Sequence, residues 1–473
     1  MSPAASTTCW QSPYRHDNHD AVESVRSRSQ LEVVTRHLRS ATLLLLAGVA
    51  GCSLSRGNGR PAADWNRQVD DVHRPQMERV RAAVAASNPT PLTFDGDAAM
   101  ERLSAAFGIL LNHHVDPLDP TALADAAIAG IASEPAAQAT ASGTVDAAIA
   151  AMVTVHDPDG AYVKAEPDAV AGDRAGSVGL ELTRRDGLLT VVSAIPDSPA
   201  ARAGIRPGDR LLAIAGLPAA AENLNAVVRT LRGPIGSGVT LTILRADSGR
   251  EVNITVTRER ILLRSVTHAR LSPTHGYVRI SLLGNDTGLD LIRALNDLPP
   301  PSRLEGLVLD LRGNGGGLLS RSVAVADLFL EHGVIVHTVG RRPTDDETIE
   351  ARPGAIWESV PLAVVVDRGT AAGGEIVAAA LQENGRARLV GTETFGRDSI
   401  QTSIQLDDAA VLRLTTHRAL TPNRSPLSHG VRPDVMFTAA PPAAEPSPDD
   451  PAVAAALDLL RREAAEPRPR TQE

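Results

Sequence analysis

The residues of this sequence that could do chemistry include a glycine-containing turn suited to binding a carboxylate. In Ser177-Val178-Gly179-Leu180 the glycine permits a tight turn, so successive backbone N–H groups can converge on an anion. An extended peptide could then add itself as a further strand from Leu180 to Leu182. A β-hairpin lip without any ligand is the alternative interpretation. The predicted peptide-binding residues are Ser177, Val178, Gly179, Leu180, Glu181 and Leu182.

Hydrolysis would need an activated nucleophile and a base, and the sequence offers neither in a recognisable arrangement. The candidate hydroxyl and imidazole side chains are Thr370, Ser320, Ser399, His417 and His429. No nucleophile elbow and no His/Asp pattern accompanies them. Lys164 is the only lysine of the chain, so amine bases are scarce. Cys9 and Cys52 lie in no CxxC or Cys/His pattern, so neither a metal nor a cofactor is expected.

The carboxylate-binding turn belongs to a stretch that the pattern predicts to be rich in short strands. β-branched alternation predicts strands over 177–182, 188–194, 210–214, 239–245 and 251–257, with short helices over 199–203 and 221–232. SVGLEL, DSPAARAGIRPGDRLLAIAG and the second of these helices follow one another in the order and spacing of bacterial PDZ modules. The segment therefore resembles a PDZ domain, which implies a groove for extended peptides or protein C-termini.

Helices are predicted before the PDZ-like stretch, and alternating strands and helices after it. Residues 77–152 are rich in Ala and Leu at helical spacing, for example at Leu103, Phe107 and Leu110. The alternating elements are strands 277–280, 307–311 and 362–366 and helices 290–298, 319–330 and 375–382. This alternation predicts an α/β core with helices packed on a largely buried sheet. The last part, rich in Pro, Ala and charge, is expected to be a weakly ordered tail around one helix, 452–462.

This core resembles the carboxy-terminal processing peptidases, also called tail-specific proteases. The segments that carry the resemblance are GYVRISLLGNDTGLDLIRAL, GLVLDLRGNGGGLLSRSVAVADLFLEHGVIV, RARLVGTETFGRDSIQTSIQL and LTTHRALTP. With the upstream DPDGAY segment and the PDZ-like module, the resemblance spans residues 100–436. It implies an α/β multidomain protein with an N-terminal helical segment, a β-rich PDZ domain and an α/β protease-type core.

The resemblance also implies a catalytic Ser/Lys pair, and both of its members are replaced. The family's Ser-Ala-Ser-Ala-Ser-Glu motif, whose middle serine attacks, corresponds to residues 370–375 and places Ala372 at the nucleophile position. The Phe-Gly-Lys-Gly segment corresponds to residues 395–398 and places Arg397 at the base position. A methyl group cannot form an acyl-enzyme. A guanidinium, with a pKa above about 12, cannot accept a proton as a general base.

Other site residues of the family have counterparts that could still serve. The glycine loop 313–317 corresponds to the loop whose backbone N–H groups help to form the oxyanion hole, with Gly316 and Gly373 as donors. Gln401 corresponds to the glutamine that orients the base, and an ordinary strand glutamine is the alternative.

The N-terminal part indicates export. Residues 41–51 (ATLLLLAGVAG) form a short apolar run after Arg36 and Arg39, which is too short to span a bilayer and is typical of a secretory signal. Val49-Ala50-Gly51-Cys52 resembles a lipobox, which implies that Cys52 is lipidated; an uncleaved segment or conventional signal cleavage are the alternatives. The expected organisation is 1–51 signal region, 52–95 tether, 96–170 helical domain, 171–262 PDZ domain, 263–437 peptidase-like core and 438–473 tail.

The charge composition argues against some classes of binding partner. A formal net charge of -9 argues against nucleic acid, whose phosphates need clustered Lys and Arg. The expected partners are peptides or protein C-termini, with the membrane reached through a lipid anchor. The main hypothesis is a catalytically inactive peptidase homologue that binds extended peptides or protein C-termini at the cell envelope. An active serine-type endopeptidase with a rewired nucleophile and base, and a purely structural envelope lipoprotein, are the alternatives.

Overall fold

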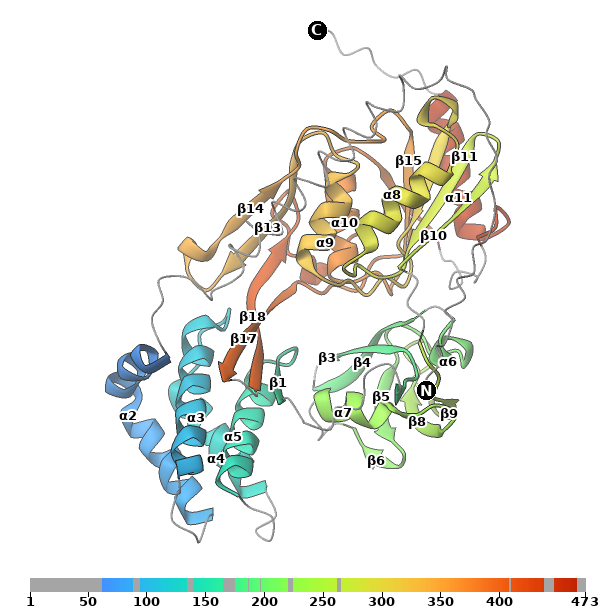
Figure 1. The fold of residues 1–473 in the computed structure, drawn as a ribbon. Coiled ribbons are helices and arrows are strands. Elements are labelled where there is room, and N and C mark those ends of the chain that lie inside the picture. Colours follow the sequence, from blue (N-terminus) through green and yellow to red (C-terminus); the bar gives the residue numbers. More distant parts are fainter. Residues whose placement is uncertain are drawn as a thin grey trace, which may run out of the picture. The chain divides into compact units, whose positions relative to one another are not determined.

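The computed structural model describes most of the chain after residue 61 (Figure 1). The described ranges are 62–87, 94–133, 140–164, 175–185, 187–195, 197–219, 224–261, 265–407, 410–437 and 446–465. The expected signal region and the lipidation residue Cys52 lie outside them. No helix within these ranges combines the length and the apolar character needed to cross a bilayer.

The first described part is a bundle of helices. It comprises α2 (Ala62–Ser87), α3 (Phe94–His113), α4 (Pro120–Ser133) and α5 (Ala141–His156). Leu103, Phe107 and Leu110 follow one another at helical spacing on α3 and are fully buried in the bundle core. Thr140 caps the N-terminus of α5, because its side chain accepts a hydrogen bond from the Gly143 N–H at 3.0 Å. The helices expected from the Ala- and Leu-rich composition are therefore present.

The expected tether is in part a folded helix. The range 52–95 contains α2, and Met77, Val80 and Val84 of this helix are buried in the same core as α3. Their spacing of three and four residues gives α2 one apolar stripe, and all three residues lie in the range 77–152 for which helices were predicted. The expectation of a tether is wrong for this helix.

A sheet connects this bundle to the peptidase-like part. Its strands are β1 (Ala161–Lys164), β18 (Ala410–Leu420), β13 (Val334–Gly340) and β14 (Glu347–Glu350) in that order, and β17 (Ser399–Asp407) also pairs with β18. Leu412 and Leu414 of β18 are buried in the same core as the bundle helices. The turn before β1 is thereby held beside β17 and β18.

The PDZ-like segment is a small β-rich domain. Its main sheet has the order β3 (Leu180–Arg185), β4 (Leu188–Ala194), β5 (Arg210–Ile214), β8 (Gly238–Leu244) and β9 (Glu251–Thr257). The remaining elements are β2 (Ala175–Gly176), α6 (Pro199–Arg202), β6 (Leu217–Pro218), α7 (Leu224–Leu231) and β7 (Gly233–Pro234). Among the described residues, β3 pairs only with β4 and lies at the edge of this sheet, where a further strand can be added.

The peptidase-like core is built around a second sheet. Its order is β10 (Val266–Ser272), β11 (His275–Ile280), β12 (Gly306–Asp310), β15 (Leu362–Val366), β16 (Arg388–Gly391) and β19 (Val435–Met436). The pairs from β11 to β19 are all parallel. Because carboxyl ends of parallel strands share one edge of the sheet, the segments after β12, β15 and β16 meet there.

Helices cover both faces of this sheet. Leu307 and Leu309 of β12 pack in the cluster that contains α8 (Thr287–Asp297), α9 (Leu319–Asp327) and α10 (Gly373–Glu383), whereas Val308 packs in the cluster that contains α11 (Pro451–Ala465). Successive strand residues point to opposite faces, so α11 covers the face opposite to α8–α10 (Figure 1). The expected α/β core is confirmed.

The expected tail is only partly a tail. The predicted helix 452–462 is α11, and its Val453 and Leu460 are buried against the sheet to within 1% exposure. The Pro- and Ala-rich sequence on either side suggested weak order, while the apolar stripe of the helix determines its packing.

Candidate functional site

A strained turn joins β15 to α10 and contains Ala372. Its backbone has φ +46° and ψ −111°, a combination that costs a residue with a Cβ about 1–3 kcal/mol and persists only where the surroundings impose it. The Ala372 N–H donates to Glu375 Oε2 at 2.8 Å, and the preceding N–H, of Ala371, donates to the Asn314 carbonyl at 2.8 Å. The turn presents a methyl group at its apex.

Glu375 fastens this turn to the segment that contains Arg397. Its fully buried carboxylate accepts hydrogen bonds from the N–H groups of Ala372, Gly396 (2.7 Å) and Arg397 (2.9 Å) and from the Thr394 hydroxyl. Burial raises the pKa of Glu375 to about 7, against the lowering effect of these donors. Since one oxygen, Oε2, accepts from both Ala372 and Arg397, the positions predicted for nucleophile and base lie side by side.

The Arg397 guanidinium is paired with a carboxylate. Its Nη2 lies 3.1 Å from Asp159 Oδ1, in the turn before β1, and the two side chains are 17% and 18% exposed. Asp159 Oδ2 accepts from the Ser399 hydroxyl at 2.7 Å, and the Gln401 side-chain amide donates to the Asp159 carbonyl. Sequence reasoning missed Asp159, although its DPDGAY segment was part of the resemblance.

The glycine loop between β12 and α9 faces the strained turn. A Cβ on Gly316 (φ +108°) would lie 2.9 Å from both the Ala372 Cβ and the Gly373 nitrogen, so only glycine permits this approach. The Gly316 N–H donates to Asn314 Oδ1 at 2.9 Å, and Asn314 Nδ2 donates to the Ile280 carbonyl at 2.9 Å. The two predicted oxyanion donors, Gly316 and Gly373, are therefore neighbours, with the first engaged by Asn314.

Comparisons with known proteins identify the family. Residues 274–437 match the model of peptidase family S41, and residues 190–258 match a PDZ domain model. The carboxy-terminal-processing protease of Bartonella bacilliformis is 37% identical over 301 residues, which are 62% of this chain and 69% of that protein. The chain belongs to the carboxy-terminal processing peptidase family. The resemblance expected from the sequence is confirmed.

Further relatives of this peptidase family agree over longer spans. The carboxy-terminal processing protease CtpB of Bacillus subtilis is 27% identical over 405 residues, which are 83% of this chain and 77% of that protein. Among solved structures, the photosystem II D1 C-terminal processing protease matches with a TM-score of 0.62 and 27% identity, covering 73% of this chain and 94% of that one.

The hydroxyl groups of Thr370, Ser399 and Ser322, near the turn at Ala372, each donate a hydrogen bond to a neighbouring acceptor. The Thr370 hydroxyl is buried and donates to the Leu311 carbonyl at 2.8 Å, and the Ser399 hydroxyl donates to Asp159. Ser322, which sequence reasoning missed, is fully buried, and its Oγ would lie 2.4 Å from a Cβ on Gly373; it donates to the Leu318 carbonyl at 3.2 Å.

The predicted imidazole bases do not reach these hydroxyls. His417 Nδ1 lies 2.8 Å from the Thr416 hydroxyl, and Ser320 and His429 are exposed. Within the described ranges, no hydrogen bond joins a candidate nucleophile to a histidine. None of the candidate hydroxyls named above therefore forms a Ser/His pair in the part of the chain that the structure describes.

The predicted peptide-binding residues lie at the start of the PDZ sheet. Gly179 has φ +79°, the tight turn expected of it, and a Cβ there would lie 2.3 Å from the Ser198 Cβ. Leu180, Glu181 and Leu182 pair with β4, and the Ser193 hydroxyl donates to Glu181 at 3.2 Å. Ser177 bridges to β9's neighbour Glu259, and Val178 is buried. The strand begins at Leu180 and not at the predicted Ser177, because the turn occupies the preceding residues.

A cavity of about 330 Å³ adjoins the Arg397 segment and is rich in arginine. Its lining residues are Arg185, Thr190, Pro207, Gly208, Arg210, Arg368, Glu393, Thr394 and Phe395. Phe395 connects the cavity to the site, because its N–H donates to the Thr370 carbonyl at 2.9 Å. Three guanidinium groups and one carboxylate give this lining an excess of positive charge, which favours acidic ligands.

Proposed function

We propose that this chain is a catalytically inactive member of its family that binds extended peptides or protein C-termini. The proposal rests on the residues at the two reacting positions of the family, which are Ala372 and Arg397 in this chain. Ala372 presents a methyl group at the apex of a strained turn, so no atom can attack a carbonyl carbon. Arg397, 3.1 Å from Asp159, keeps its proton and cannot act as a general base.

Several features support a binding role. β3 is an edge strand, and the turn at Gly179 precedes it, an arrangement suited to strand addition with a terminal carboxylate at the turn. Relatives of this chain are named for processing carboxyl termini. The arginine-rich cavity next to the site suits acidic groups in a bound peptide.

The proposed location is the outer side of a cell membrane. The apolar run 41–51 and the lipobox-like Val49-Ala50-Gly51-Cys52 support export followed by lipidation of Cys52. Labelling with a fatty-acid analogue tests this: Cys52→Ser should abolish incorporation, whereas Cys9→Ser should not. Equal labelling of both variants would contradict the anchor.

Incubation of the purified protein with an unfolded protein substrate bearing an apolar C-terminus tests the absence of catalysis. We expect no cleavage, as measured by mass spectrometry. Cleavage that disappears in Ser322→Ala, Thr370→Ala or Ser399→Ala would identify a rewired nucleophile and refute the proposal. Cleavage that persists in all three would refute it as well and leave the nucleophile outside this group.

Calorimetry tests the binding role, with one peptide prepared as the free acid and as the amide. We expect the free acid to bind about tenfold or more tightly, because charge-assisted bonds to backbone N–H groups are lost in the amide. Gly179→Ala should abolish this preference because its Cβ would clash with Ser198. Gly187→Ala is the matched control: its φ is +76°, and its Cβ meets nothing within 4 Å. No measurable affinity in the unaltered protein would favour a structural role.

A further inference from the structure

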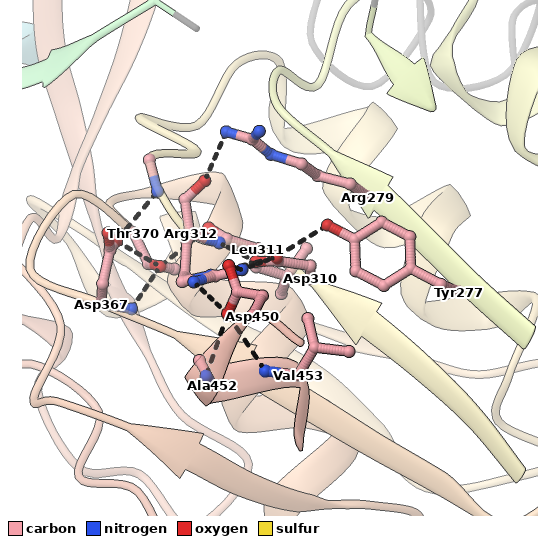
Figure 2. Close-up of polar contacts among 11 residues, drawn as sticks. Tyr277, Arg279, Asp310, Leu311, Arg312, Asp367, Thr370, Asp450, Ala452 and Val453 are labelled. Carbon is pink, nitrogen blue, oxygen red and sulfur yellow. Dashed lines mark hydrogen bonds and ion pairs between the residues drawn. The ribbon is translucent and has the colours of Figure 1, made fainter. Parts of the chain in front are cut away.

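Arg312 joins the end of β12 to the glycine loop and is buried between two carboxylates. Its side chain is 1% exposed. On one side, Asp310 accepts from its Nε at 3.0 Å and from Nη2 at 2.6 Å, and the Tyr277 hydroxyl donates to the same carboxylate at 2.8 Å. On the other side, Nη1 and Nη2 each lie 3.1 Å from an oxygen of Asp450 (Figure 2).

Asp450 lies outside the sheet and directly precedes α11 (Pro451–Ala465). Its Oδ1 also accepts from the N–H groups of Ala452 (2.9 Å) and Val453 (3.2 Å), so one carboxylate caps the helix and binds Arg312 (Figure 2). The helix itself is attached by apolar contacts with the sheet. The buried residues of this contact are Tyr277, Val308, Ala363, Val365, Val390, Ala452, Val453, Ala456, Leu457, Leu459 and Leu460.

The chain beside Arg312 is connected to the strained turn of the candidate site. The N–H of Gly313 donates to Asp367 Oδ1 at 2.9 Å, and the Leu311 carbonyl accepts from Thr370 Oγ1 at 2.8 Å (Figure 2). Two residues further on, the Asn314 carbonyl accepts from the Ala371 N–H at 2.8 Å. Displacement of Arg312 therefore moves the residues that hold both the glycine loop and the turn at Ala372.

We propose that Asp450 is a positioning residue: through Arg312 it makes the geometry of the glycine loop 313–317 depend on the docking of α11. A buried guanidinium that loses one of two carboxylates retains its charge but not its compensation, so the chain around it rearranges. Asp310 alone cannot replace Asp450, because Asp310 lies on the sheet side of the guanidinium. The inference goes beyond peptide binding and requires no ligand.

The test compares the hydrogen exchange of the loop amides in three variants. Asp450→Asn removes the charge and keeps a capping side chain; Asp449→Asn makes the same change at the exposed neighbouring residue. Leu460→Ala weakens the apolar docking and leaves the ion pair intact. At temperatures equally far below each variant's Tm, we expect amides 313–317 to exchange at least about tenfold faster in Asp450→Asn, and within about threefold of the unaltered protein in the other two.

Two results would overturn the proposal. Unchanged exchange in Asp450→Asn would show that the loop is independent of Asp450. Equal acceleration in Asp450→Asn and Leu460→Ala would show that Asp450 contributes only to the general stability of the helix. If Asp450→Asn does not fold, Asp450→Ser, which supplies a helix-capping hydroxyl in place of the carboxylate, is used with the same expectations. Because the readout needs no peptide, it is unaffected if the proposed binding role fails.

Discussion

The variant Ala372→Ser with Arg397→Lys returns both reacting groups of the family to this site, yet we expect it to remain nearly inactive because Asp159 is retained. The returned serine would occupy a turn whose backbone is already held in place by Glu375 and Asn314. The returned lysine would meet the carboxylate that now lies 3.1 Å from the Arg397 guanidinium. A lysine acts as a base only when its amine is neutral.

The size of this effect follows from the ion pair. A carboxylate at this distance raises the pKa of a lysine amine by about 1–3 above its usual ~10.4. At about pH 8, the neutral fraction then falls from roughly 0.4% to between roughly 0.04% and 0.0004%. Asp159 thus lowers the concentration of the active base by about 10- to 1,000-fold, because a higher pKa leaves less neutral amine at a fixed pH. The Arg397 and Asp159 side chains are only 17% and 18% exposed, so solvent and salt screen the interaction at this position weakly.

Adding Asp159→Asn to the double variant should raise the rate of peptide cleavage by about 10- to 1,000-fold at about pH 8. It should also shift the rise of the pH–rate profile to lower pH. Initial rates with a fluorogenic peptide measure both. Asp398→Asn is the matched control, since Asp398 accepts from Arg418 at 3.2 Å and not from Arg397. A double variant as active as the triple variant would refute the role assigned to Asp159.

Burial raises the pKa of Glu375 to about 7 from 4.5, so between these values the folded chain holds a proton that the unfolded chain has released. The free energy of unfolding should therefore fall as pH rises through this window, by up to about 3 kcal/mol, and Glu375→Gln should remove the slope in urea titrations; an equal slope in both proteins would contradict the assignment. Gly316→Ala should lower the free energy of unfolding by well over the ~1 kcal/mol expected from backbone strain in Gly313→Ala. Of these two glycines, only Gly316 would place its new Cβ against other atoms. Equal losses in denaturant titrations would argue against the close approach of the glycine loop and the turn at Ala372. Met77→Ala should lower the free energy of unfolding by about 2–5 kcal/mol if α2 belongs to the folded bundle. The same change at the exposed neighbour, Glu78→Ala, should alter this free energy by less than about 0.5 kcal/mol. Similarly small effects of both variants would support the predicted tether over a packed helix.

Local patterns predicted many of the elements and the positions that correspond to the catalytic pair. The strands 188–194, 210–214 and 362–366 have the predicted bounds, because β-branched alternation and continuous apolar runs are local signals. Alignment with two family motifs placed Ala372 at the nucleophile position and Arg397 at the base position. In the structure the backbone N–H groups of both residues donate to Glu375 Oε2, so the two positions lie close together.

The partners that decide the state of the site could not be predicted in this way. Asp159 is 238 residues from Arg397, and Asp450 is 138 residues from Arg312. No periodicity relates residues so far apart, and an aspartate in a turn or before a helix is locally explained by turn formation or capping. The stretch around α11 was predicted to be weakly ordered from its Pro, Ala and charge content, while six buried apolar residues pack the helix on the sheet: Ala452, Val453, Ala456, Leu457, Leu459 and Leu460.

The strained turn at Ala372 does not by itself indicate activity. Its conformation costs about 1–3 kcal/mol, while each of the buried hydrogen bonds to Glu375 and Asn314 contributes about 0.5–1.5 kcal/mol, so these bonds together can hold the turn whatever side chain stands at its apex. A serine should therefore fit without rearrangement of the backbone. The base position differs, because its chemistry depends on charge and not on backbone shape. Reactivation is therefore limited less by the backbone of the turn at Ala372 than by the charge at position 397. The Asp159 carboxylate is the larger obstacle, because it stabilises the protonated form of a lysine at that position.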